Sequence, residues 1–106
     1  MKTKKEVENI VSTLALQIRA VLGDNLNSVI LFGSYARGDY EEYSDVDVMV
    51  LLDVPKEQVN LYRKTIYGKA SELEWEHDML ISPVIQSSET FYKYKNASGC
   101  VVKELF

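Results

Sequence analysis

Residues 33–52 have the sequence GSYARGDYEEYSDVDVMVLL, and this stretch decides the fold. It begins with a glycine-bounded turn, Gly33 to Gly38, of a size that suits a phosphate group. It ends as an apolar strand that opens with two carboxylates, Asp45 and Asp47. Because alternate side chains of a strand point to opposite faces, these carboxylates share one face, with Cα atoms roughly 6.5 Å apart. Their mutual repulsion and desolvation favour a bound divalent cation.

The residues before this stretch predict one helix and one strand. Apolar side chains recur at three- and four-residue steps from Val7 to Leu22, which is typical of an amphipathic helix with one buried face. Gly23 ends that helix. The continuous apolar run 29–32 predicts a strand buried on both faces, followed by the turn at Gly33 and a second strand over residues 45–52.

The residues after this stretch predict a second helix, a third strand and a helical tail. Pro55 suits a first helical turn, and apolar residues follow at helical spacing to Leu73. Residues 75–85 are rich in β-forming types and predict the third strand. In the tail we expect helix around 91–94 and again near 101–106, with a break at 96–99.

This order of elements predicts an α/β (α+β) fold with a small mixed sheet and flanking helices, forming a single domain over residues 1–106. The first two strands are too close in sequence for a parallel crossover, so we expect an antiparallel pair. A whole helix joins the second strand to the third, which predicts a parallel pair with a right-handed crossover. The start of the third strand, Glu76 to Asp78, is then expected at the same end of the sheet as Asp45 and Asp47.

Composition limits the classes of partner and the compartment. The 106 residues carry 12 Lys and Arg against 16 Asp and Glu, a net charge of −4 that argues against nucleic acid as a partner. No apolar stretch approaches the roughly 20 residues that span a bilayer, so no membrane role is expected. A single cysteine, Cys100, and an N-terminus without an apolar signal region predict a cytoplasmic protein, with the cysteine used for packing.

The paired carboxylates predict a magnesium site. Mg²⁺ is held by a few carboxylates together with substrate phosphates, and two such ions can clamp the attacking and leaving oxygens of a phosphoryl or nucleotidyl displacement. A third carboxylate is then expected on the neighbouring strand. Asp78 is the best candidate, and Glu74 and Glu76 remain alternatives with the same strand parity.

The turn itself predicts a phosphate-binding role. Gly33 allows a sharp turn and close approach of the backbone, Ser34 offers a hydroxyl, and Arg37 adds a permanent positive charge suited to phosphate oxygens. The aromatic residues of the loop, Tyr35, Tyr40 and Tyr43, either pack or line a nucleotide or partner surface. His77 is interpreted as structural, with a role in orienting a carboxylate or contacting substrate as the alternative.

One pattern in the sequence resembles the signature of the DNA polymerase β-type nucleotidyltransferase superfamily: Gly33-Ser34 followed, after ten residues, by Asp45-Val46-Asp47. Residues 33–50 are most similar to the minimal nucleotidyltransferase (MNT) branch of that superfamily. The resemblance implies that Ser34 binds nucleotide phosphate and that Asp45 and Asp47 ligate Mg²⁺. It implies that Asp78 is the third acid, acting as general base and metal ligand.

Small members of this branch are commonly paired with a helical HEPN-type partner in toxin–antitoxin pairs, and some transfer AMP from ATP to a tyrosine of that partner. The resemblance therefore implies an antitoxin-type protein adenylyltransferase that uses a nucleoside triphosphate and two Mg²⁺ ions, with the acceptor on a partner protein. Larger members have an acceptor-binding domain, for which this chain has no room. The alternative is a non-catalytic module of the same fold that binds nucleotide or neutralises its partner by contact. A nucleic-acid polymerase or tRNA-modifying enzyme is disfavoured by the acidic charge.

Overall fold

One mixed sheet organises the chain, which is described here by a computed structural model over residues 2–42, 44–98 and 102–104. Four strands lie in the order β3-β2-β1-β4. They are β1 (Leu26–Phe32), β2 (Val46–Leu52), β3 (Ile81–Ser87) and β4 (Val102–Glu104). As expected, β1 and β2 are antiparallel and β2 and β3 are parallel. The mixed α/β sheet with flanking helices is thereby confirmed.

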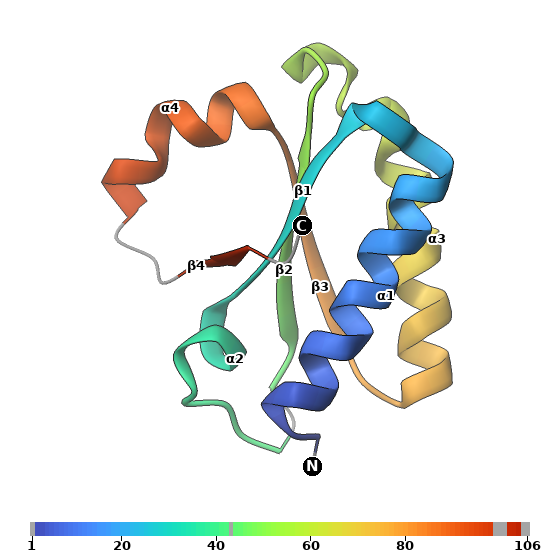
Figure 1. Cartoon of the computed structure of the whole chain (residues 1–106), viewed down its shortest axis with the longest axis vertical. Helices are drawn as coiled ribbons and strands as arrows, with labels where there is room; N and C mark the ends of the chain where they lie inside the picture. The colour runs from blue at the N-terminus through green and yellow to red at the C-terminus, as the bar shows by residue number, and fades with distance from the viewer. Residues whose placement is uncertain (1, 43, 99–101, 105–106) are drawn as a thin grey trace.

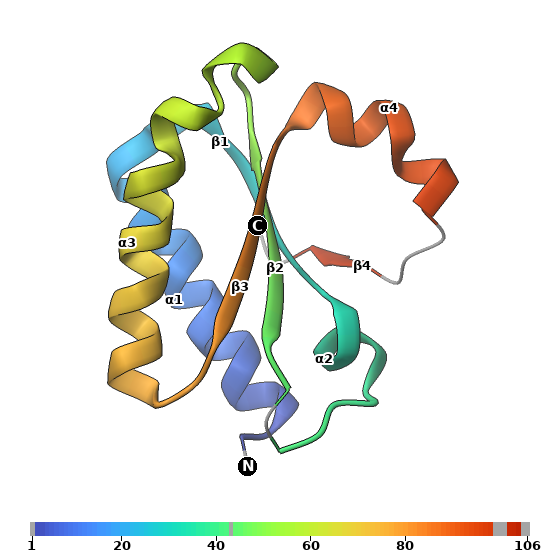
Figure 2. The same ribbon diagram turned by 180° about the vertical axis from the view of Figure 1, so that it is seen from behind.

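Helices cover the two faces of the sheet unequally. Two long helices, α1 (Lys4–Leu22) and α3 (Asn60–His77), lie side by side on one face, while α2 (Gly33–Arg37) and α4 (Ser88–Ser98) lie on the other (Figures 1 and 2). Short 3₁₀ turns over Gly23–Asn25 and Lys56–Gln58 follow α1 and precede α3. None of the helices within residues 2–42, 44–98 and 102–104 combines the length and apolarity needed to cross a membrane.

The core lies between the sheet and the two long helices. Alternate residues of β2, Val46, Val48 and Val50, point into it and are buried, and they pack with apolar side chains of α1 and α3. Full burial of such a side chain contributes about 1.5–3 kcal/mol relative to exposure. The intervening β2 residues Asp47 and Met49 therefore occupy the opposite face, where α2 and α4 leave the sheet less covered.

The predicted start of the third strand was wrong. Residues 75–77 continue α3, and β3 begins only at Ile81. The helix persists because Ile66, Ala70 and Leu73 keep the three- and four-residue spacing of its buried face. It ends at Asp78, whose backbone adopts the left-handed conformation with φ of 51°.

The prediction for the tail was also wrong in part. The expected helix around 91–94 is present, but α4 runs on to Ser98, through part of the expected break. Residues 102–104, expected to be helical, form β4, which pairs antiparallel with β1. Val102 is a β-branched residue that suits a strand, and the edge of β1 was open for pairing. Cys100 lies outside the described residues.

Candidate active site

The glycine-bounded turn folds as the short helix α2. Gly33 follows β1 with a φ of 72°, a left-handed conformation that favours glycine. At the other end, Gly38 has a φ of 90° and donates its N–H to the carbonyl of Ser34 at 2.8 Å. The two glycines thus reverse the chain within a few residues, and Ser34 and Arg37 both lie on this turn.

The turn touches the strand that carries the carboxylates. A Cβ atom added to Gly33 would collide with Oδ2 of Asp47 and would lie 3.0 Å from its Cγ. Phe32, the residue before the turn, is the register partner of Asp47 across the β1–β2 ladder. The absent side chain of Gly33 therefore leaves the space that the carboxylate of Asp47 fills.

The two carboxylates lie in different environments. Asp45 precedes β2 and is exposed, whereas Asp47 lies within β2 and is partly buried. Burial raises the pKa of Asp47, and the negative charge of Asp45 raises it further, while Arg37 acts in the opposite direction. The opposing effect of Arg37 places its charge near the same group.

Arg37 is available to an incoming anion. Its Nε lies 3.3 Å from Oδ2 of Asp39, and the two side chains are 50% and 64% exposed. An ion pair this exposed contributes little free energy, so it is easily exchanged for another anion. The same guanidinium is near enough to Asp47 to lower the pKa of that carboxyl, and its planar fork of donors suits phosphate oxygens.

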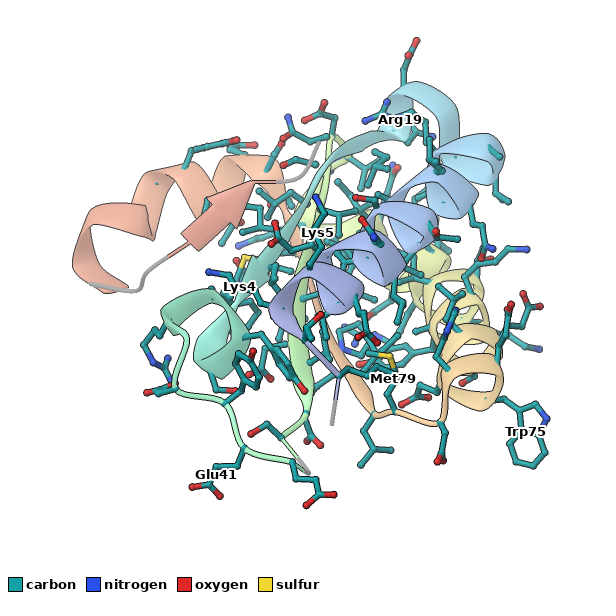
Figure 3. The ribbon with its side chains drawn as sticks, turned by 60° about the horizontal axis from the view of Figure 1, so that its bottom comes forward. Lys4, Lys5, Arg19, Glu41, Trp75 and Met79 are labelled. Carbon is teal, nitrogen blue, oxygen red and sulfur yellow. The ribbon has the colours of Figure 1, made fainter. Side chains whose placement is uncertain are left out.

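An aromatic stack supports the loop between α2 and β2. The rings of Tyr35 and Tyr40 lie 4.3 Å apart with an interplanar angle of 14°. Tyr35 is buried in the core, and the nearby carbonyl of Ala36 accepts a hydrogen bond from Nζ of Lys4 at 3.3 Å (Figure 3). These two tyrosines therefore have a packing role; Tyr43 lies outside the described residues.

The structure does not bring Asp78 to the carboxylate pair. Among the residues that the structure describes, no group of three acidic, histidine or cysteine side chains could hold a metal ion. Asp78 lies in the turn between α3 and β3, and Glu76 lies in α3, so neither shares the strand parity that the sequence suggested. Glu74 accepts a hydrogen bond from the N–H of Ile81 at 2.8 Å, which ties its carboxylate to the start of β3.

Asp78 instead lines a neighbouring cleft of about 900 Å³. The cleft lies between the start of α1, the loop before β2 and the end of α3, and His77 and Ser44 also line it. Trp75 lines it as well, yet it is 92% exposed and projects from the end of α3 (Figure 3). Through Ser44, this cleft adjoins Asp45.

The donors that are brought together suit a hard cation. Asp45 and Asp47 offer carboxylate oxygens; burial raises the pKa of Asp47, and the nearby charge of Asp45 raises it further. Oxygen ligands of this kind are those Mg²⁺ prefers, with substrate phosphates completing its coordination. Two carboxylates next to a turn suited to phosphate are the features that the structure brings together here.

Fold and site together define a nucleotidyltransferase, and the chain belongs to the nucleotidyltransferase domain family, whose sequence profile matches residues 5–102. It is 47% identical over 81 residues to a Methanocaldococcus jannaschii protein named "Putative protein adenylyltransferase MJ0141", covering 76% of this chain and 79% of that protein.

Two solved structures share the fold. A putative nucleotidyltransferase from Sulfolobus solfataricus superposes with a TM-score of 0.63 at 22% identity, covering 98% of this chain and 86% of that one. A toxin–antitoxin crystallised with AMP-PNP superposes with a TM-score of 0.56 at 20% identity, covering 93% of this chain and 72% of the other. These superpositions confirm the polymerase β-like fold.

The raised pKa of Asp47 predicts a pH-dependent difference in stability between the native chain and Asp47→Asn. When a carboxyl has a raised pKa in the folded state, the free energy of unfolding of the protein falls as pH rises through that pKa. The destabilisation persists at neutral pH. In EDTA at pH 7 we therefore expect Asp47→Asn to melt at a higher temperature than the native chain. The gap should narrow as pH falls and close below 3.8, the ordinary carboxyl value, where Asp47 is protonated in both the folded and the unfolded chain.

Thermal melts over a pH series in EDTA measure this difference. Adding Mg²⁺ and ATP should raise the melting temperature of the native chain more than that of the variant, because ligands that bind only the folded state stabilise it. Equal melting temperatures at pH 7 in EDTA would contradict the electrostatic account of Asp47.

Proposed function

We propose that this chain transfers AMP from ATP to a hydroxyl of a partner protein in a Mg²⁺-dependent reaction, as an antitoxin-type protein adenylyltransferase. The observation that carries the proposal is the close contact between Asp47 on β2 and Gly33 at the start of α2. It joins a pair of carboxylates to a turn suited to phosphate. The similarity to a relative named as a protein adenylyltransferase supports the choice of AMP and of a protein acceptor.

Each residue of the site has a proposed role. Asp45 and Asp47 would hold Mg²⁺, which supplies charge neutralisation and alignment for the triphosphate when bound. Gly33 admits the phosphates close to the backbone, Ser34 contacts them through its hydroxyl, and Arg37 exchanges its pairing with Asp39 for phosphate oxygens. The acceptor oxygen forms a bond to the α-phosphorus while the bond from that phosphorus to pyrophosphate breaks.

The proposed acceptor is a tyrosine hydroxyl on a helical partner of the HEPN type. A structural neighbour is a toxin–antitoxin solved with AMP-PNP, which supports a pairing between a nucleotide-binding protein of this fold and a toxin. The cleft next to Asp45 is lined in part by the exposed Trp75, which a partner protein could contact. A partner seated there would bring its hydroxyl to the edge of the carboxylate pair.

The test is a transfer assay with a candidate partner. We expect mass spectrometry to find an added AMP on the partner after incubation with the chain, ATP and Mg²⁺. The modification should be absent in EDTA and absent with Asp47→Asn. With the chain alone we expect weak MgATP binding and little turnover. Rapid modification of a free small-molecule alcohol by the chain alone would contradict a protein acceptor.

A second candidate function is neutralisation of the partner by contact without turnover. It is favoured by one observation, that β3, the strand next to the carboxylates, contains no acidic residue. In that case the chain would suppress its partner equally with and without ATP, and Asp47→Asn would suppress it as well as the native chain. Loss of suppression on omission of ATP would exclude this candidate.

A further inference from the structure

The strand next to β2 carries a serine at the position paired with Asp47. In the parallel ladder between β2 and β3, Ser82 is the register partner of Asp47. Neighbouring strands lie about 4.8 Å apart, and register partners place their side chains on the same face. The burial pattern agrees, because Ile81 and Ile85 are buried in the core and Ser82 between them is exposed. Ser82 therefore stands next to Asp47 on the open face of the sheet.

The acidic residues nearest in sequence come before β3 and do not occupy that position. Asp78 ends α3 in a left-handed conformation and donates its backbone N–H to the carbonyl of Glu74. Glu74 in turn accepts the N–H of Ile81 with its carboxylate, at 2.8 Å. Both residues thus stabilise the turn between α3 and β3. On β3 itself, the open face of the sheet carries Ser82, Val84 and Gln86.

We infer that Ser82 is the third side chain of the transfer site, a neutral hydroxyl in the place where a carboxylate would give the site a third anionic ligand. The inference rests on the proposed function. With only Asp45 and Asp47 as anionic ligands, the nucleotide-free chain binds Mg²⁺ weakly, and the oxygens of the triphosphate supply the missing ligands. Metal and nucleotide therefore bind together.

Ser82 does not serve as the base of the transfer step. As the acceptor oxygen bonds to the α-phosphorus and pyrophosphate leaves, the hydroxyl must lose its proton. An alcohol side chain is a poor base near neutral pH, so Ser82 does not retain that proton. In the proposed step the proton passes to water, to which this edge of the sheet is open at Ser82.

The test compares Ser82→Asp with Ser82→Asn, two variants of nearly equal shape that differ in charge. Calorimetric titration of the nucleotide-free chains with MgCl₂ is the readout, so no turnover is needed. We expect the aspartate variant to bind Mg²⁺ about tenfold or more tightly than the native chain, because a third carboxylate adds both a ligand and a charge. The asparagine variant should match the native chain. Equal Mg²⁺ affinity of the two variants would overturn the inference.

A second variant covers the case in which three crowded carboxylates prevent folding. Ser82→Cys places a thiolate at the same position, and soft ligands select soft metals. We expect it to gain affinity for Cd²⁺ over the native chain, and to lose that gain when Asp47→Asn is added. No gain would overturn the placement of Ser82. If instead the native chain shows no MgATP binding that depends on Asp47, the proposed function fails, whatever residue 82 does.

Discussion

Nucleotidyl transfer is expected to fall by several orders of magnitude in Asp47→Asn, with the fold retained. The change preserves the shape of a side chain that fills the space above Gly33, but it removes the charge that would bind Mg²⁺. Metal binding stabilises the charge that develops in the transition state and aligns the reacting oxygens, so its loss affects both. The measurement is the rate of AMP addition to the partner, with circular dichroism to show that the variant is folded.

Two comparisons make this result specific. Asp45→Asn should cause a comparable loss, because it removes the other carboxylate of the pair. Asp24→Asn is the matched control, since Asp24 is an exposed carboxylate in the 3₁₀ turn after α1, and it should keep native activity. Near-normal turnover of the Asp45→Asn, Asp47→Asn double variant with Mg²⁺ present would exclude the carboxylates as the transfer site.

Gly33→Ala should lower both activity and stability. The φ of 72° at this position costs an L-residue about 1–2 kcal/mol. The added methyl group would also collide with the Asp47 carboxylate, so strand pairing or the carboxylate itself must move. A displacement of about 1 Å at a reacting group can cost about 100-fold in rate. Thermal melts and the transfer assay measure the two effects separately.

Gly23→Ala is the matched control for this variant. Gly23 also has a positive φ, 58°, but nothing lies within 4 Å of the Cβ that it would gain. Its substitution should therefore show the backbone strain alone, with native rates of transfer. If Gly33→Ala and Gly23→Ala behave alike in both assays, the contact with Asp47 has no role in the site.

The parts of the fold that the sequence predicts well are those with a strong local pattern. The helix over residues 7–22, the apolar strands before Gly33 and after Asp45, and their antiparallel pairing all follow from periodicity and loop length. Much of the site is predictable for the same reason, because the turn and both carboxylates lie in one continuous stretch. The contact of Gly33 with Asp47 is not readable from spacing, although a glycine directly after a buried strand is a signal of close approach.

The errors arise where two patterns compete. Residues 75–85 as a whole are rich in β-forming types, but Leu73 continues the buried face of α3, and packing carries the helix to His77. Because the helix is longer than predicted, Asp78 precedes the strand, and the residue paired with Asp47 is Ser82. Ser82 is not part of any recognisable sequence motif. The strand β4 depends on an open edge of β1, which is a property of the assembled sheet and not of the residues 102–104 themselves.

The antiparallel pair β1 and β2, with α2 between them, has a consequence for the order of folding. Every residue proposed to bind nucleotide or metal lies within this one continuous segment, so its contacts close only short loops of chain. Local contacts of this kind form early, whereas the parallel pairing of β3 must wait for the longer crossover through α3. The half of the sheet that carries the carboxylates is therefore expected to assemble first, and Ser82 joins it only with β3.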